Sequence, residues 1–288
     1  MLKKSVKITY AEPWLPLHHR LFIEVVETCS ARFALKKRYD SYTKNVQNKI
    51  GNDCWDLALN SLGVQFPNLN LPKKNKNKGL IIAANHPYGV TDGVILSWLA
   101  SRYDSDFRVI AHGILQKEPS LAPNILPIDF SNNKNAMRNN VNIRKEAINI
   151  LNNNGVIAIF PAGAVAWSRK KGEPIKEEYW KPMIGKLLNS SAADLLLIKF
   201  KGSNSKIFQT ASRINQTMKQ SLYLYEIKKS LDKYIDLEIC EFMQNKNLPN
   251  FNDKELDIDI YNSEMTYEKF KKTVIDYADK ASYPSLTN

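Results

Sequence analysis

One stretch of the sequence decides the fold: Leu80-Ile81-Ile82-Ala83-Ala84-Asn85-His86-Pro87-Tyr88-Gly89-Val90-Thr91-Asp92-Gly93. Its first five residues form a continuous apolar run, which is typical of a strand buried on both faces of a sheet. The stretch leads into the apolar segment Val94 to Leu99, which predicts a helix. A buried strand that enters a helix through a polar turn is the beginning of an α/β unit, and such folds place their active sites at strand ends.

The same alternation continues along the chain. Short apolar runs predict further strands, and segments with helical periodicity lie between them. The pattern predicts an α/β fold with a central, mixed and largely parallel sheet flanked by helices. The predicted strands cover residues 80–84, 107–111, 156–160, 195–200 and 234–240, and the predicted helices cover 93–101, 141–151, 181–188, 221–225 and 266–280.

The sequence predicts a helical segment at residues 1–75, followed by an α/β domain at residues 76–288. Apolar residues recur at helical spacing from His19 to about Lys37, and a second helix is predicted from Trp55 to Leu62. A polar, basic loop follows from Pro67 to Lys78. The first helix has two interpretations: it packs on the sheet as a core element, or it associates with a membrane surface.

The overall charge favours an anionic partner. The 288 residues contain 41 Lys and Arg against 29 Asp and Glu, a net charge of +12. An anionic membrane surface and an acidic carrier protein are both compatible with this charge. No nucleic-acid partner is expected, since no nucleic-acid-binding motif is recognisable. Three cysteines at unrelated spacings indicate a reducing compartment, and no run of ~18 apolar residues predicts a membrane span, so we expect a cytoplasmic protein.

The candidate chemistry lies in the turn after the first strand. His86 precedes Asp92 by six residues, across a turn that contains Pro87 and Gly89. If the turn folds back, the carboxylate holds one imidazole nitrogen and the other nitrogen acts as a general base. The alternative interpretation is structural: Asp92 caps the following helix and His86 packs in the loop.

Three other predicted strands also end in loops with notable residues. The strand at 156–160 enters the Pro161-Ala162-Gly163 turn, where backbone N–H groups can approach a substrate. Arg108 lies on the strand at 107–111, and Gly202-Ser203-Asn204-Ser205 follows the strand at 195–200. Successive strand-end loops of this kind can assemble one site.

These segments resemble the motifs of the glycerolipid and lysophospholipid acyltransferases. Asn85 to Gly93 is similar to the first motif, although five residues separate His86 from Asp92 where four are usual in the family. The longer spacing resembles the branch of hemolysin-like proteins and ornithine-lipid N-acyltransferases. The remaining matches keep the family's order between residues 55 and 240: 107–115 for the second motif, 160–163 for the third, 180–182 for a segment after it and 202–208 for the fourth.

The resemblance implies an acyltransferase of lipid metabolism, as in phospholipid biosynthesis. It implies transfer of a fatty acyl group from acyl-CoA or an acyl carrier protein to a lysophospholipid or glycerol-type hydroxyl. The alternative is N-acylation of an amino acid, as in ornithine-lipid synthesis. No cofactor and no metal are expected, since the acyl thioester is itself a substrate. The enzyme would act at the cytoplasmic face of a membrane as a peripheral protein.

The resemblance also implies roles for individual residues. His86 and Asp92 would be catalytic, and the predicted substrate contacts are Asn85, Gly89, Arg108, Phe160, Pro161, Gly163 and Asn204. The turns at Gly89 and Gly163 are candidate donors to the oxyanion.

The third motif departs from the wider family. Ala162-Gly163-Ala164-Val165 replaces the Glu-Gly-Thr-Arg type that grips an acceptor phosphate. A basic side chain nearby would then supply the contact, or the acceptor is not a phosphate monoester. The candidate basic residues are Arg108, Arg169, Lys170 and Lys171, of which the last three also fit a solvated basic turn.

Overall fold

A computed structural model describes residues 9–47, 49, 51–129, 134–178, 180–181 and 183–247. Within them lies a six-stranded sheet of order β3-β2-β4-β1-β5-β6. Five strands are parallel and β6 is antiparallel to β5. The sheet confirms the predicted mixed, largely parallel α/β fold. The strands are β1 (Leu80–Ala84), β2 (Phe107–His112), β3 (Ile125–Ile128), β4 (Val156–Ile159), β5 (Asp194–Phe200) and β6 (Leu237–Met243).

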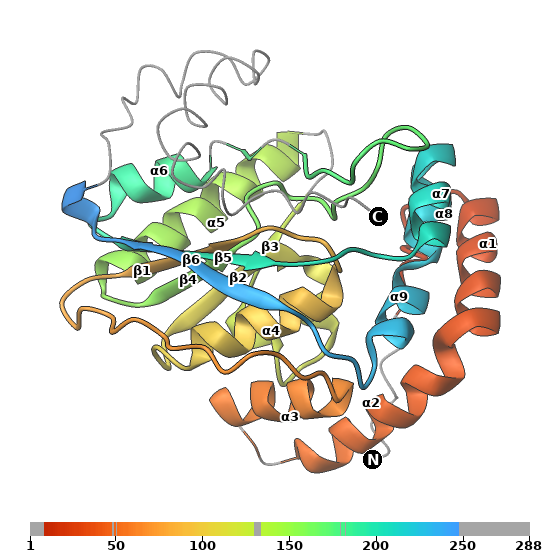
Figure 1. Cartoon of the computed structure of the whole chain (residues 1–288), viewed down its shortest axis with the longest axis horizontal. Helices are drawn as coiled ribbons and strands as arrows, with labels where there is room; N and C mark the ends of the chain where they lie inside the picture. The colour runs from red at the N-terminus through yellow and green to blue at the C-terminus, as the bar shows by residue number, and fades with distance from the viewer. Residues whose placement is uncertain are drawn as a thin grey trace.

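Helices cover both faces of the sheet (Figure 1). All five residues of β1 are buried, and they alternate between two cores because successive side chains of a strand point to opposite faces. Ile82 packs with α3 (Asn52–Leu62) and α4 (Val90–Ser101). Ile81 packs with α5 (Lys134–Asn152) and α6 (Met183–Ser190). The apolar run that opens the deciding stretch is therefore the centre of the fold.

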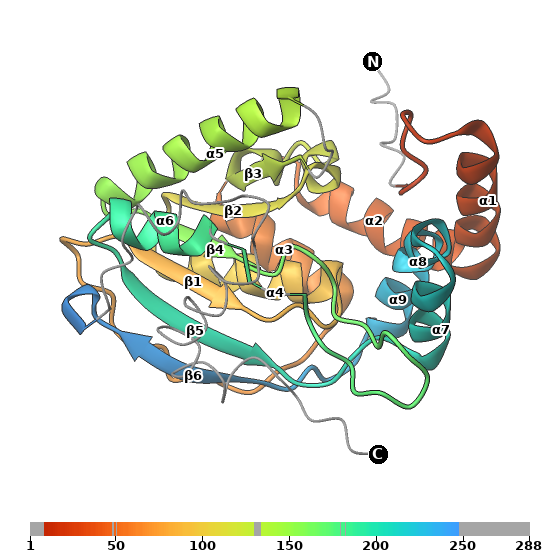
Figure 2. The ribbon, with the colours of Figure 1, turned by 90° about the horizontal axis from the view of Figure 1, so that it is seen from above.

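A second group of helices lies beyond one end of the sheet (Figure 2). The N-terminal helix runs without a break through α1 (Leu17–Glu27), the π-helical turn η1 (Thr28–Arg32) and α2 (Phe33–Asn45). Its first part packs against α8 and its last part against α3. The other members are α7 (Lys206–Ile214), α8 (Gln216–Ser221) and α9 (Tyr223–Ser230).

The helical segment before β1 shares the main core. Trp55 of α3 is fully buried, its ring lies 6.0 Å from that of Phe107, and its Nε1–H donates to Oδ1 of Asn124 at 3.1 Å. Helix α3 ends at Gly63, whose φ of 65° is in the left-handed region that favours glycine at a helix C-terminus. Residues 67–78 follow as a loop with no regular element, as predicted.

Strand β3 and helix α7 were not predicted from the sequence. Strand β3 is a short edge strand that contains Pro127. Ser205 caps the start of α7, since its hydroxyl accepts from Phe208 N. The predicted helix at 221–225 is instead the junction between α8 and α9. Two short 3₁₀ segments, η2 (Gly113–Lys117) and η3 (Ala122–Asn124), join β2 to β3, and a third, η4 (Asn245–Asn247), follows β6. The predicted helix at 266–280 lies outside the described residues.

Candidate active site

The parallel strands bring three of the predicted loops together. β1 lies between β4 and β5, with Ala83 opposite Ile159 and Ala84 opposite Ile198. The three strands run in the same direction, so the loops that follow them lie at the same edge of the sheet. Residues 85–89, 160–167 and 201–205 thus surround one place, as expected for a site built from several strand-end loops.

His86 and Asp92 form a pair in this place. Nδ1 of His86 lies 3.0 Å from Oδ1 of Asp92, and neither atom has another partner among the described residues. Asp92 is fully buried, whereas the imidazole keeps 17% exposure. With Nδ1 turned toward the carboxylate, Nε2 is the nitrogen left to act as a base.

The turn between the two residues explains why they meet. Gly89 has a φ of 85° and begins α4, and its N–H has no acceptor among the described residues. Oδ2 of Asp92 accepts from Tyr88 N at 2.8 Å, so the carboxylate holds the turn with one oxygen and faces the imidazole with the other. The helix has no side-chain cap, and a capping role alone does not account for Asp92.

The third motif supports the ring of His86. Phe160 stacks on the imidazole with ring centroids 4.0 Å apart and an angle of 26° between the planes. Gly163 has a φ of 67°, and its N–H donates to Phe160 O at 3.0 Å. This N–H is already used by the turn, which leaves Gly89 as the candidate oxyanion donor of the two. The carbonyl of Pro161 accepts from Lys181 N at 3.0 Å.

A buried carboxylate that sequence reasoning missed also contacts His86. Oε1 of Glu177 accepts from His86 N at 2.5 Å, and Oε2 accepts from Trp180 Nε1 at 3.1 Å. Burial raises the pKa of Glu177 to about 8, although both hydrogen bonds act in the opposite direction. Glu177 lies in a polar stretch without regular structure, where an acidic residue is typical of a solvated turn. The sequence therefore gives no signal that this carboxyl group is buried beside His86.

Asn204, a predicted substrate contact, lies in the loop after β5. The residue is 4% exposed, and neither its amide nitrogen nor its amide oxygen has a partner among the described residues. Buried amides are normally hydrogen-bonded, so these atoms are available to a water molecule or a substrate. Tyr88 fixes the start of this loop, because its hydroxyl donates to Lys201 O at 2.8 Å.

Two predicted substrate contacts have other roles in the structure. Asn85 joins β1 to β5: its Nδ2 donates to Phe200 O at 2.8 Å and its Oδ1 accepts from Phe200 N at 2.6 Å. The amide nitrogen and the amide oxygen of Asn85, which was predicted to contact a substrate, are therefore both bonded to the backbone of Phe200. Arg108 lies opposite Ile157, near the amino end of β2, and pairs with Asp106 at 3.1 Å. Because the site is at the carboxyl end, the structure does not bring Arg108 to it.

The other basic candidates lie on a hairpin, residues 165–178, in which Trp167 pairs with Lys176. Arg169 pairs with Glu178 at 2.7 Å and Lys170 with Glu173 at 3.7 Å, as in a solvated basic turn.

A further basic residue, Lys219 of α8, was not predicted and contacts the loop after β4. Its Nζ donates to Val165 O at 3.2 Å, and burial lowers its pKa to about 8.

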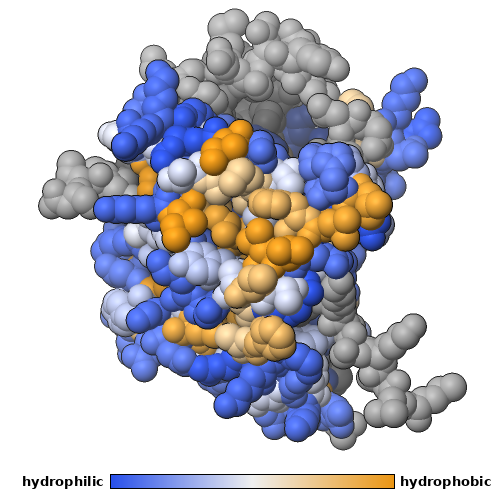
Figure 3. Space-filling model, turned by 90° about the vertical axis from the view of Figure 1, so that its right-hand side faces the viewer, coloured by the Kyte–Doolittle hydropathy of each residue, from blue (hydrophilic) through white to orange (hydrophobic). Residues whose placement is uncertain are grey.

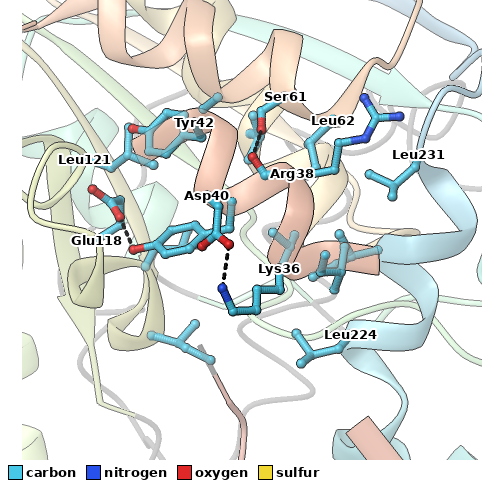
Figure 4. A pocket seen from close by; sticks show the side chains of 18 of the residues that line it. Lys36, Arg38, Asp40, Tyr42, Ser61, Leu62, Glu118, Leu121, Leu224 and Leu231 are labelled. Atoms are coloured by element: carbon cyan, nitrogen blue, oxygen red, sulfur yellow. Dashed lines mark hydrogen bonds and ion pairs between the residues drawn. The ribbon is translucent and has the colours of Figure 1, made fainter. Parts of the chain in front are cut away.

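An apolar cavity of about 370 Å³ lies beside the site. Residues of α2, α3, α4, α9 and η2 line it. Figure 4 shows lining side chains from α2, α3 and α9, among them Tyr42, Leu62 and Leu224. Val90 and Val94 line it from α4, directly after the turn that holds His86. Tyr10 lines it too and packs on Tyr223, which is a neighbour of Gly89. The cavity therefore begins near the turn between His86 and Asp92.

One relative found by comparison with known proteins has a name that agrees with the sequence motifs. No family model matches the chain. The chain is similar to the lyso-glycine lipid O-acyltransferase of Phocaeicola vulgatus, with 27% identity over 174 residues; the match spans 60% of each chain. Among solved structures, the 1-acyl-sn-glycerophosphate (LPA) acyltransferase PlsC of Thermotoga maritima matches with a TM-score of 0.42 and 14% identity, over 93% of this chain and 96% of that one. The curated relative confirms the resemblance of this chain to the glycerolipid and lysophospholipid acyltransferases.

Proposed function

We propose that the protein is an acyltransferase that moves a fatty acyl group from an acyl thioester to the hydroxyl of a lyso-lipid. The observation that carries the proposal is the pair formed by His86 and Asp92, with the imidazole partly exposed and the carboxylate buried. A poor nucleophile such as an alcohol requires a base, and an imidazole held by a carboxylate is a suitable one. The curated relative, named as an O-acyltransferase, supports the same chemistry.

The geometry supports a direct transfer. Nε2 of His86 takes the proton of the acceptor hydroxyl while the hydroxyl oxygen attacks the thioester carbonyl carbon. The carbon–sulfur bond then breaks, and the leaving thiolate takes the proton from the imidazolium, so that an ester and a free thiol are released. Asp92 stabilises the imidazolium between the two steps. We assign the N–H of Gly89, at the start of α4, as the donor to the oxyanion.

The proposed acceptor is a hydroxyl. The alternative acceptor, an amine, is favoured by the spacing of His86 and Asp92, and the chain lacks the phosphate-gripping residues of the wider family. The relative is named as an O-acyltransferase of a lyso-lipid, which supports a lyso-lipid hydroxyl as the acceptor. The free amide of Asn204 and the turn at Gly163 are the proposed acceptor contacts.

The apolar cavity supports a lipid substrate. We assign the cavity to the acyl chain, because its walls are mostly aliphatic and aromatic and its volume is within the usual range of ligand sites. Four of its polar lining residues have partners within the protein: Lys36 pairs with Asp40 at 2.5 Å, and Tyr39 donates to Glu118 at 2.5 Å. An apolar chain can therefore occupy the cavity without leaving these groups unpaired.

The helices beyond the sheet carry an exposed apolar face (Figure 3). Leu21, Val25 and Phe33 are 55%, 62% and 78% exposed, so these side chains do not pack on the sheet. Lys206 and Arg213 add positive charge on α7. An apolar face with basic neighbours is typical of helices that lie in the headgroup region of an anionic membrane. The apolar face consists of Trp14, Leu17, Leu21, Val25, Phe33, Ile207 and Ile214.

We therefore propose peripheral association with the cytoplasmic leaflet through the apolar face. No helix in the described part of the chain is both long and apolar enough to cross a membrane. Flotation with vesicles of phosphatidylcholine and phosphatidylglycerol tests the proposal, with Leu21→Glu/Val25→Glu as the variant and Val141→Glu, on α5, as the control. The wild type and the control should float at low salt and the variant should not; absence of wild-type binding at low salt would contradict the proposal.

The activity is tested by product analysis. The purified protein is incubated with palmitoyl-CoA or palmitoyl-acyl carrier protein and with a panel of lyso-lipids and amino acids, and the products are identified by mass spectrometry. We expect a new ester on a lyso-lipid. An amide product would establish the alternative acceptor, and no acyl transfer to any acceptor from either donor would contradict an acyltransferase function.

A further inference from the structure

The main chain of His86 is held from both sides by one hairpin, residues 165–178. Ala166 N donates to His86 O at 2.9 Å, and His86 N donates to Oε1 of Glu177 at 2.5 Å. The pairing of Trp167 with Lys176 joins the two ends of the hairpin next to these contacts. The backbone on each side of the His86 side chain therefore has a partner from the same element.

The partner on one side is chemically unusual. Glu177 is 6% exposed, and no basic group forms an ion pair with it in the described part of the chain. Burial of a carboxyl group without a cation is costly, and such groups are retained where their hydrogen bonds matter. Both oxygens of Glu177 accept N–H groups, one from His86 and one from Trp180. The side chain thus joins the hairpin to His86 and to Trp180, which lies just before α6.

Glu177 does not reach the imidazole of His86, since its contact is with the backbone nitrogen. Its effect on the reaction must therefore pass through the placement of His86. Fixing the peptide groups on both sides of a residue fixes the direction of its Cα–Cβ bond, and the staggered rotamers then limit the ring to a few positions. In His86 this direction brings Nδ1 to 3.0 Å from Asp92 and lays the ring on Phe160.

We infer that Glu177 is a positioning residue that holds the backbone of His86 so that Nδ1 of the imidazole faces Asp92. The inference rests on the proposed function only for its catalytic consequence. The positioning itself is a property of the free protein and can be measured without substrate.

The direct test is the tautomer of His86. The chain contains four histidines, so ¹⁵N-histidine labelling gives four imidazole signals in long-range ¹H–¹⁵N spectra, and His86→Ala identifies the relevant one. In the wild type at a pH above the imidazole titration we expect the proton on Nδ1. In Glu177→Ala, and in Glu177→Leu, which fills the volume without an acceptor, the signal should shift toward the tautomer mixture of free imidazole.

The matched control is Glu178→Ala. Glu178 is the next residue, and its carboxylate contacts Arg169 and Trp167 but not His86. A rescue variant, Glu177→Gln/Trp180→Phe, keeps an amide oxygen for His86 N and removes the Trp180 N–H that would face the amide nitrogen. Both proteins should retain the wild-type His86 signal, with folding checked by circular dichroism.

Kinetics supply the second readout. If the proposed activity is present, Glu177→Ala should lower kcat by about 10-fold to 100-fold, the size expected for a misplaced base, with KM for the acyl donor changed less than twofold. The rescue variant should recover most of kcat. An unchanged His86 tautomer in both folded variants at Glu177 would overturn the inference. A changed tautomer in a protein without acyltransferase activity would instead overturn the proposed function and leave the positioning role intact.

Discussion

The ring of Phe160 stacks on the imidazole of His86, with ring centroids 4.0 Å apart. The two residues follow neighbouring strands of the sheet, β4 and β1, so the contact joins two strand-end loops across the sheet edge. The stacked ring covers one face of the imidazole. Rotation of the base away from Asp92 therefore has to break this packing.

Phe160→Leu should lower kcat by about 5-fold to 10-fold, because leucine fills part of the volume but gives no flat surface against the imidazole. KM for the acyl donor should change little. The control is Phe66→Leu, whose ring packs on Trp98 at 5.4 Å. Steady-state kinetics of both variants test the prediction; equal losses in the two would indicate a general effect on stability.

Asp92→Asn should reduce activity by about 100-fold or more while the fold is retained. The amide still accepts from Tyr88 N, but it no longer stabilises an imidazolium and does not hold the proton on Nδ1. Asp106→Asn, at the opposite end of the sheet, is the matched control and should keep wild-type activity. Activity of Asp92→Asn within threefold of the wild type would show that the carboxylate only supports the turn.

Val94→Trp should shorten the acyl chain that the enzyme prefers. Val94 lines the cavity from α4, and a larger side chain there removes volume without touching His86. Competition between acyl donors of 8, 12 and 16 carbons (roughly 1 to 2 nm extended) measures the preference. Transfer of the short chain should survive while that of the long chain falls by about tenfold. An unchanged preference would mean that the acyl chain lies elsewhere.

The stability of the protein should depend on pH through Glu177. Burial raises its pKa from the ordinary value of 4.5 to about 8, so between these pH values the folded state binds a proton that the unfolded state has released. Stability contributed by this group is therefore present at low pH and is lost as pH rises toward 8. The variant Glu177→Gln has no titrating group at this position, so its stability does not fall with pH for this reason.

Urea unfolding at pH 5, 6.5 and 8.5 measures the effect. The free energy of unfolding of Glu177→Gln, relative to wild type, should increase steadily over this range, whereas that of Glu178→Gln should stay level. If the difference in free energy of unfolding between Glu177→Gln and wild type does not vary with pH, the result contradicts a raised pKa of the Glu177 carboxyl group.

The buried centre of the fold was predictable because it obeys simple patterns. β1 is five apolar residues between a basic loop and a polar turn, and such a run indicates a strand buried on both faces. Strand β3 was missed because Pro127 argues against a strand, and only an edge position tolerates it. Helix α7 had a usable signal, the N-cap Ser205 followed by Phe208 and Ala211, that was read only as part of a loop motif.

The site was predictable only where chemistry coincides with a local motif. His86 and Asp92 are six residues apart and meet through a single turn, so their pairing followed from spacing. Glu177 reaches His86 from 91 residues away through a hairpin with no regular pattern, and only the folded chain reveals the contact. The position of Arg108 on a strand follows from the sequence, but it lies near the amino end of β2, away from the carboxyl end where the site forms.

The central claim is that His86 is the base of an acyl transfer to a lyso-lipid. The most direct measurement is the rate of ester formation by His86→Ala and wild type, with identical acyl donor and lyso-lipid, followed by mass spectrometry. We expect His86→Ala to lose at least ~100-fold in rate, with the fold unchanged by circular dichroism. A folded His86→Ala protein that forms the ester at a rate close to that of the wild type would contradict it.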